Sequence, residues 1–251
     1  MNDRSMDSGE LEGSLKESFE VGIILPTYCE VANISKLIQE IEAIEMNLCI
    51  LVIDDSSPDG TMDVVRSLQE KYDNILLYVR PAKTGLGTAI TDGFKTFLSL
   101  PNPPKYIVTM DADYSHNPKD VPRVVAAAKK GKGLAIGSRY CKGGRIENWS
   151  FFRLLTSRIA NMIAYLRVRA KIHDYTSGLR CYSTNLVKRM VSDLHSQTYE
   201  IQIETIRQAY KRQFDIREVP MTFVNRKKGK SKLSANEIRE FITYILRMRN
   251  S

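Results

Sequence analysis

Two carboxylates near the middle of the chain, Asp111 and Asp113, have the types and spacing best suited to chemistry. They directly follow segment 107–110, which has the residue types of a buried strand. Side chains at i and i+2 of an extended segment point to the same side, so both carboxylates can converge on one cation. Mg²⁺ and Mn²⁺ favour such oxygen ligands, together with the phosphates of a bound molecule. The same pair could instead cap the next helix, and its surroundings must decide between the two interpretations.

Two other loops carry polar groups directly after a predicted strand. One contains Pro26, Tyr28 and Glu30, and the other opens with Asp54 and Asp55. Ligands of open α/β sheets lie beyond the carboxyl ends of the strands, where these loops and the aspartate pair would meet. An acid after a second strand commonly accepts hydrogen bonds from a nucleoside. These loops are therefore the candidate ligand site.

Glycine-rich phosphate loops are missing from this sequence. No G-x-G-x-x-G follows the first predicted strand, and segment 85–87 comes one unit too late and lacks the third glycine. No G-x-x-x-x-G-K-[ST] motif occurs either. We therefore expect a metal ion and basic side chains to hold phosphates, with Lys83 and the basic run 226–232 as candidates.

Strands alternating with helices must position these loops. Apolar runs typical of buried strands occupy 21–25, 48–53, 75–79, 107–110 and 134–136, and apolar residues at helical spacing follow the first four. This alternation predicts an α/β fold with a mostly parallel central sheet and helices on both faces. Residues 1–18 are polar and acidic, and we expect them to form a disordered tail before a single domain over 19–251.

The segment 145–171 is basic and amphipathic. It holds six Arg or Lys residues against the single acid Glu147. Its apolar residues recur at helical spacing: Leu155, Ile159, Met162, Ile163 and Leu166. Such a helix could lie in a membrane interface, or it could pack its apolar stripe on the core with its basic residues in solvent. A capping-box pattern at 234–237 predicts a last amphipathic helix near the C-terminus.

Charge and cysteine usage narrow the class of protein. The 251 residues carry a net charge of +8, but residues 1–20 hold six acids against two bases, so the remainder carries +12. Such a body suits polyanionic partners: nucleic acid, an anionic membrane or phosphorylated substrates. The four cysteines lie far apart, so neither a zinc site nor a disulfide framework is indicated. Without a signal-peptide pattern or an apolar run of about 18 residues, we expect a cytoplasmic protein with only peripheral membrane contact.

Several motifs in order resemble those of family 2 glycosyltransferases of the dolichol-phosphate mannosyltransferase kind. The resemblance spans roughly residues 21–245. It rests on Pro26-Thr27-Tyr28-x-Glu30, Asp54-Asp55-Ser56-Ser57-Pro58-Asp59-Gly60-Thr61, Lys83-Thr84-Gly85-Leu86-Gly87-Thr88-Ala89, Asp111-Ala112-Asp113-x-Ser115-His116, Gly137-Ser138-Arg139-Tyr140, Thr176-Ser177-Gly178-x-Arg180-x-Tyr182, and Val219-Pro220 through Phe223, Arg226, Gly229, Ser231, Lys232 and Leu233.

The resemblance implies a Rossmann-like nucleotide-sugar-binding fold of the GT-A type. It implies metal-dependent, inverting transfer of mannose from GDP-mannose to dolichyl or another polyprenyl phosphate, with Mg²⁺ or Mn²⁺ as cofactor. It further implies a position on the cytoplasmic face of a membrane, that of the endoplasmic reticulum in a eukaryote. A small membrane subunit becomes a candidate partner.

The resemblance also implies roles for individual residues. Asp111 and Asp113 would hold the metal against the donor diphosphate, and Arg139 and Arg226 would join them as catalytic residues. The donor would be bound by Pro26, Tyr28, Glu30, Asp55, Lys83, Asp111, Arg226 and Lys232. The acceptor phosphate would be bound by Arg139, Arg153 and Ser157.

Alternatives to this function remain open at the level of sequence. A glucosyltransferase using UDP-glucose on the same lipid is the nearest, because nothing visible fixes the base or the hexose. The basic body also admits a non-catalytic membrane-surface or nucleic-acid-binding protein, but its basic residues cluster beside motif loops rather than with stacking aromatics, so we expect no nucleic acid. Asp174 could act as a base towards a hydroxyl acceptor, or orient the site for a phosphate that is already ionised.

Overall fold

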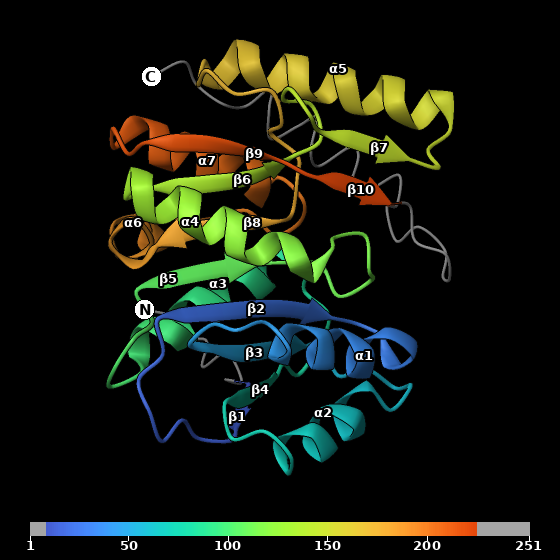
Figure 1. Cartoon of the computed structure of the whole chain (residues 1–251), viewed down its shortest axis with the longest axis vertical. Coiled ribbons are helices and arrows are strands. Elements are labelled where there is room, and N and C mark those ends of the chain that lie inside the picture. Colours follow the sequence, from blue (N-terminus) through green and yellow to red (C-terminus); the bar gives the residue numbers. More distant parts are fainter. Residues whose placement is uncertain (1–8, 225–251) are drawn as a thin grey trace, which may run out of the picture.

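An eight-stranded sheet forms the centre of the protein (Figure 1). The computed structural model describes residues 9–224. The strands lie in the order β1-β4-β3-β2-β5-β8-β6-β9. Their bounds are β1 Glu10–Glu12, β2 Val21–Thr27, β3 Leu48–Asp54, β4 Ile75–Val79, β5 Tyr106–Thr109, β6 Leu134–Ser138, β8 Arg180–Ser183 and β9 Ile216–Pro220. A separate parallel pair joins β7 Arg145–Glu147 to β10 Thr222–Val224.

The sheet is mostly parallel, as predicted. β4, β3, β2 and β5 are parallel neighbours, and β6 pairs in parallel with β9. Only the edge strand β1 and the inserted strand β8 run antiparallel to their neighbours. All five strands predicted from apolar runs are present, and the carboxyl ends of β3, β2 and β5 lie side by side.

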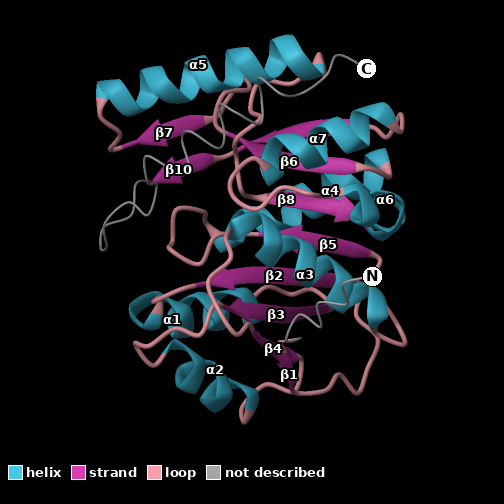
Figure 2. Cartoon of the chain, turned by 180° about the vertical axis from the view of Figure 1, so that it is seen from behind, coloured by secondary structure: helices cyan, strands magenta, loops and turns pink. Residues whose placement is uncertain are grey.

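Helices cover both faces of the sheet (Figure 2). One face is covered by α1 Val31–Glu42, α2 Thr61–Gln69 and α4 Val121–Gly131, and the other by α3 Leu86–Ser99, α6 Thr184–Met190 and α7 Ile201–Lys211. Alternate residues of a strand point to opposite faces, so Ile23 and Leu25 enter one core while Ile24 enters the other. Burial on both faces explains why these strands read as continuous apolar runs.

The N-terminal segment is more ordered than the sequence indicated. Residues 10–12, expected within a disordered tail 1–18, form β1, which places Glu10 opposite Val79. Glu12 Oε1 forms a 2.8 Å ion pair with Nη2 of Arg66, which lies 54 residues away in the chain. The tail prediction was wrong for this strand, because a distant cation offsets one of the acids that suggested disorder. Arg226, Lys232 and the predicted C-terminal helix lie outside the described residues.

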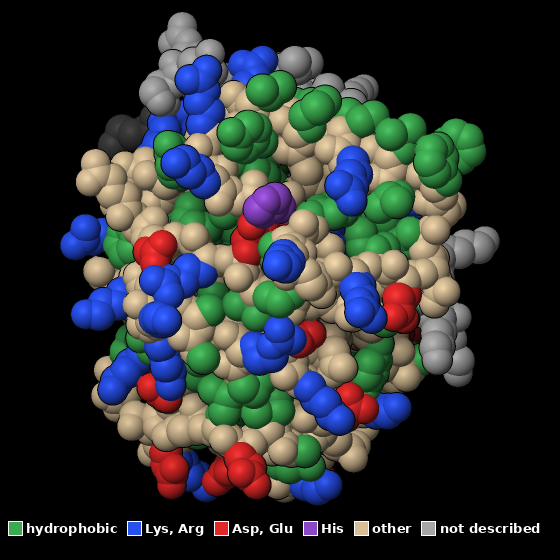
Figure 3. Space-filling model, turned by 45° about the horizontal axis from the view of Figure 1, so that its top comes forward, with side chains coloured by type: hydrophobic (Ala, Val, Ile, Leu, Met, Phe, Trp, Pro, Cys, Tyr) green, Lys and Arg blue, Asp and Glu red, His purple; other side chains and the backbone are tan. Residues whose placement is uncertain are grey.

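The helix α5, Phe151–Val168, turns its apolar stripe outward. Only Asn161, Ala164 and Val168 are buried along it. Four of the five predicted stripe residues are exposed: Leu155 46%, Ile159 43%, Met162 57% and Leu166 60%. Phe151 and Phe152 at the start of the helix are exposed at 73% and 78%, whereas Ile163 packs against the core. Figure 3 shows hydrophobic side chains gathered along the upper edge of the molecule, with Lys and Arg side chains nearby. Most of the predicted stripe is therefore exposed and only Ile163 packs against the core, which favours the interfacial interpretation of segment 145–171.

Candidate active site

The loops after β2 and β3 are joined by buried polar contacts. Asp54 is fully buried at the end of β3 and accepts from the Thr27 hydroxyl at 2.7 Å. It also accepts from the backbone N–H and the hydroxyl of Ser57, at 2.7 and 2.8 Å. In turn, the Ser57 hydroxyl receives the Cys29 N–H at 2.9 Å. Asp54 thus fixes the shape of both loops, and its neighbour Asp55 is the acid directed to other partners.

Asp55 is paired with Arg80, a residue that the sequence analysis did not identify. Arg80 directly follows β4, is 3% exposed, and donates from Nε to Asp55 Oδ1 at 2.7 Å. Burial raises the pKa of Asp55, and the Arg80 guanidinium opposes that rise. Arg80 also donates to the Gly85 carbonyl at 3.2 Å and to the Thr88 hydroxyl at 2.7 Å. It therefore couples the predicted nucleoside acid to the loop that carries Lys83, and its position after a strand is the signal that could have revealed it.

Two predicted donor-binding residues, Tyr28 and Lys83, meet at the same rim. Lys83 Nζ lies 4.4 Å from the centroid of the Tyr28 ring, within the range of a cation–π contact. Pro26 is half-buried in β2, and Glu30 is buried at the N-terminus of α1, where it accepts from Asn33 Nδ2 at 2.9 Å. Tyr28 and Lys83 therefore lie closest to the open side of this group.

The aspartate pair lies directly beyond β5. The Asp111 side chain is 36% exposed, whereas Asp113 is 9% exposed and accepts the Ser115 N–H at 3.0 Å. His116 Nδ1 accepts the Asp111 N–H at 3.4 Å, and burial lowers the pKa of His116 to about 4. The imidazole is thus neutral at pH 7 and supports the loop.

The donor set fits a hard cation that shares its coordination with a ligand. Residues 9–224 contain no group of three or more His, Cys, Asp or Glu side chains able to hold a metal by themselves. Mg²⁺, however, is usually bound by one or two carboxylates, with phosphates and water in its other positions. A Cβ added at Gly178 would lie 3.0 and 3.1 Å from the Asp111 oxygens, so glycine preserves the space at this carboxylate. Metal binding by Asp111 and Asp113 stays a prediction.

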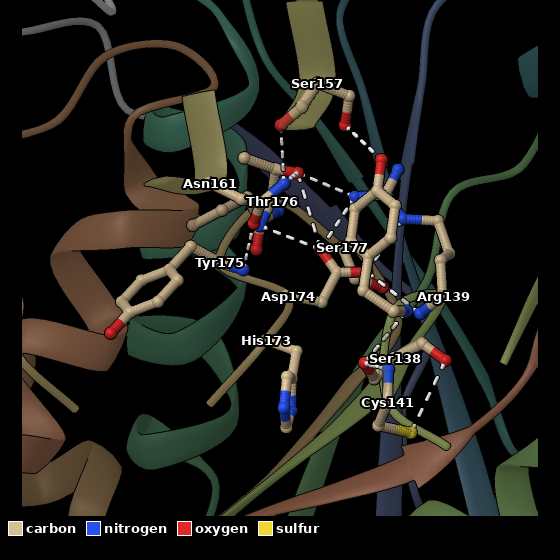
Figure 4. Close-up of polar contacts among 12 residues, drawn as sticks. Ser138, Arg139, Cys141, Ser157, Asn161, His173, Asp174, Tyr175, Thr176 and Ser177 are labelled. Carbon is tan, nitrogen blue, oxygen red and sulfur yellow. Dashed lines mark hydrogen bonds and ion pairs between the residues drawn. The ribbon is translucent and has the colours of Figure 1, made fainter. Parts of the chain in front are cut away.

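Arg139 and Asp174 form a buried pair (Figure 4). Arg139 donates from Nε to Asp174 Oδ2 at 2.8 Å and from Nη2 to Oδ1 at 2.7 Å. The Arg139 and Thr176 backbone N–H groups add bonds of 2.9 and 3.1 Å to the same carboxylate. Burial alone would raise the pKa of Asp174, but the Arg139 guanidinium outweighs it and holds that pKa below its ordinary value. Such a carboxylate is a poor base, and the geometry supports its orienting role.

The three residues predicted for the acceptor phosphate lie in one cluster. Trp149 contacts two of them, with its ring centroid 4.3 Å from the Arg153 guanidinium and 5.3 Å from that of Arg139. The Tyr140 hydroxyl bonds to Ser157 Oγ at 2.8 Å, and the Tyr140 ring centroid lies 5.4 Å from the Arg139 guanidinium. We call these five residues the arginine–aromatic cluster. The sequence analysis did not place Tyr140 and Trp149 beside these residues, because single aromatics carry no periodic signal.

Sequence comparison relates the chain to enzymes that transfer sugars. Residues 22–191 match the family described as glycosyl transferase family 2. The chain is 35% identical over 240 residues to the polyprenol monophosphomannose synthase of Mycolicibacterium smegmatis, covering 95% of this chain and 90% of that protein. It is 36% identical over 235 residues to the dolichol-phosphate mannosyltransferase of Pyrococcus furiosus, covering 91% of this chain but only 63% of that longer protein.

Structural comparison relates the fold to that of a glucosyl-3-phosphoglycerate synthase from Mycobacterium tuberculosis. Its structure in complex with Mn²⁺, uridine diphosphate and phosphoglyceric acid aligns with a TM-score of 0.67 at 17% identity, covering 93% of this chain and 80% of that one. The structure of the same enzyme with its product and Mn²⁺ aligns with a TM-score of 0.64. At this identity the likeness concerns the fold alone, and it confirms the predicted nucleotide-sugar-binding fold.

Proposed function

Because this chain belongs to glycosyl transferase family 2 and is a glycosyltransferase, we propose that it transfers mannose from GDP-mannose to a polyprenyl or dolichyl phosphate. The names of the two relatives, which match most of this chain, support the sugar and the class of lipid. One structural observation carries the proposal. In segment 174–178, the first residue, Asp174, binds Arg139, and the last residue, Gly178, lies beside the Asp111 carboxylate. A donor at the aspartates and an acceptor phosphate at Arg139 would therefore be adjacent.

On the donor side, the proposed roles follow from charge. Breaking the bond between the diphosphate and the anomeric carbon leaves the electron pair on the departing diphosphate. A divalent cation held by Asp111 and Asp113 would supply positive charge there. Lys83 would add a cation at the rim beside Tyr28, where the nucleotide would bind. Arg226 and Lys232 keep the phosphate-binding role that the family resemblance implies.

On the acceptor side, no strong base is required. A phosphate monoester has a second pKa of about 6, so its oxygen is already largely ionised at neutral pH. That oxygen would attack the anomeric carbon from the face opposite the diphosphate, which inverts the configuration. Arg139, Arg153 and Ser157 would hold the phosphate during this attack. The saturated hydrogen bonding of Asp174 is consistent with such an acceptor.

Donor competition tests this function directly. The protein is incubated with Mn²⁺, a short polyprenyl phosphate and either radiolabelled GDP-mannose or radiolabelled UDP-glucose. We expect lipid-linked product from GDP-mannose and its loss on chelation of the metal. Product from UDP-glucose alone would show that the transferred sugar is glucose and not mannose. Product from neither donor would contradict the proposal that the protein is a polyprenyl-phosphate glycosyltransferase.

The exposed stripe of α5 supports peripheral membrane association. Within residues 9–224 no helix combines the length and apolarity needed to cross a bilayer. The outward stripe adjoins basic residues of the same helix, among them Arg158, which is exposed. Apolar side chains and cations on one exposed surface are typical of helices that lie in the interface of an anionic membrane. We propose this surface as the route to a lipid acceptor.

Charge reversal on α5 should weaken vesicle binding. Arg158→Glu changes the local charge by two, and each basic residue near an anionic surface contributes about 1 kcal/mol, so we expect at least a ~10-fold loss of affinity. Sedimentation with phosphatidylserine-containing vesicles at low and high salt measures it. Lys71→Glu, on a different helix end, makes the same charge change and should leave binding unaltered. Equal binding by both variants and the wild type would contradict the interfacial role.

A further inference from the structure

Trp149 is held at the N-terminal end of α5. The preceding residue, Asn148, has φ +61, a left-handed conformation that asparagine adopts more readily than most residues. The following residue, Ser150, is the N-cap of the 18-residue helix and accepts the Arg153 N–H at 3.3 Å. The positive end of the helix dipole therefore lies beside the indole.

The indole is partly buried and contacts two cations and one aromatic ring. The guanidinium groups of Arg153 and Arg139 lie 4.3 and 5.3 Å from its centroid. Phe223 of β10 contacts it edge-on, with centroids 5.4 Å apart and the planes at 75°. Phe223 also meets His116 edge-on, at 5.5 Å. Trp149 is thus packed between the two arginines predicted for the acceptor and the loop of the aspartate pair.

The indole N–H lacks a partner in this enclosure. Trp149 Nε1 is buried, and among the residues that the structure describes no acceptor bonds to it. Buried donors are rarely left unpaired, because each costs free energy comparable to a lost hydrogen bond. The neighbouring guanidinium groups are donors themselves and cannot accept this N–H. Arg153 and the helix N-terminus favour an anionic oxygen as the missing acceptor, and Arg139 adds a second guanidinium, whose charge is shared with Asp174.

We propose that Trp149 binds the acceptor of the reaction, donating its Nε1–H to an oxygen of a phosphate monoester. Its ring contacts the guanidinium groups of both Arg139 and Arg153, which would bind the same phosphate. The inference rests on the proposed function for the lipid nature of that ester. It adds a neutral donor to the two arginines, whose charge would distinguish a lipid phosphate from the corresponding lipid alcohol.

The fluorescence of the intact protein tests this proposal without any sugar donor. Trp149 is the single tryptophan of the chain, so all tryptophan emission reports on this site. We expect a saturable emission change with a short polyprenyl phosphate, the same change only at higher concentration with inorganic phosphate, and none with the matching polyprenol. An equal response to polyprenol and its phosphate, or no response to the phosphate, would overturn the proposal.

Trp149→Phe separates the hydrogen bond from the aromatic packing. It keeps a ring between the arginines but removes the N–H, and loss of a hydrogen bond to a charged group predicts about a 10-fold rise in the Kd for polyprenyl phosphate, measured by calorimetry. The KM for the sugar nucleotide and the Tm should not change. Tyr72→Phe, at the end of α2, removes one polar hydrogen elsewhere and serves as the control. An unchanged Kd, or equal losses for both substrates, would overturn the role of Trp149.

The two proposals fail in different ways. If GDP-mannose gives no product but polyprenyl phosphate still changes the emission, the donor is wrong and the role of Trp149 stands. If product forms normally, but polyprenyl phosphate leaves the wild-type emission unchanged and the Kd of Trp149→Phe equals that of the wild type, the role of Trp149 is wrong and the proposed function stands.

Discussion

Asp111→Asn is expected to lower kcat for sugar transfer about 10²–10³-fold while leaving the fold intact, because electrostatic stabilisation of a developing charge commonly has this magnitude. Asparagine has nearly the same shape, so it fits the space that Gly178 leaves beside this side chain. The side chain is 36% exposed, so its charge is not part of the buried core. What changes is the negative charge available to a cation on the donor diphosphate. Initial rates at saturating substrates, with Mn²⁺ and with Mg²⁺, measure the effect.

Nucleotide binding identifies the cause of that loss. We expect the variant to bind GDP like the wild type without metal, but to gain less affinity than the wild type when Mn²⁺ is added. Asp63→Asn is the matched control, since this carboxylate is 79% exposed on α2 and pairs with Arg66. It should change neither rate nor binding. Loss of this stabilisation should leave far less than a tenth of the wild-type rate. If Asp111→Asn kept more than about a tenth of that rate, the aspartate pair would not stabilise the departing diphosphate.

The parts of the fold that could be predicted are those with local signals. β2 and β3 are buried on both faces, so their sequences are continuous apolar runs that indicate strands directly. β8 was missed because it opens with Arg180, which suggests an exposed segment. In the structure this guanidinium is fully buried and donates to the carbonyls of Tyr175, Ser177 and Gln202. Those acceptors come together only after folding, and no local pattern reports them.

The same distinction applies to the site. Asp111 and Asp113 could be predicted because their chemistry depends on a spacing of two residues within one segment. Arg80 could not be paired with Asp55 in advance, since 25 residues and a helix separate them. The meeting of Arg139 and Arg153 at one indole depends on where α5 begins relative to β6. Family resemblance supplied the acceptor residues, whereas the aromatic residues between them required three-dimensional placement.

Asp174→Asn separates an orienting carboxylate from a catalytic base. Removing one partner of a buried ion pair leaves the Arg139 guanidinium without a counter-charge, and the expected loss is about 3–5 kcal/mol in the free energy of unfolding. Turnover should fall as well, because Arg139 loses the partner that fixes its orientation. A base that only removed a proton would give the loss of turnover with little loss of stability. Chemical denaturation at pH 7 and initial rates measure the two quantities.

The pH dependence of this stability difference has a defined sign. The pKa of Asp174 is lower in the folded protein than its unfolded value of about 3.9, so the carboxylate stabilises the fold fully at pH values well above 3.9. This contribution is lost as the pH falls through the lowered pKa. The difference in unfolding free energy between wild type and variant should therefore be constant from about pH 6 to 8 and shrink below about pH 4. A difference of the same size at pH 7 and pH 3 would contradict a charged Asp174.

The double variant Asp174→Asn with Arg139→Met completes the argument. It removes the guanidinium that the single change leaves unpaired, so it should recover part of the lost stability, because a buried pair replaced by uncharged side chains is often neutral in stability. It should recover no activity, since the cation that would hold the acceptor phosphate is gone. Recovery of stability without recovery of transfer would mean that the fold requires only that neither side chain is left as an unpaired buried charge. The reaction, by contrast, needs the arginine itself, and the aspartate because it orients that arginine.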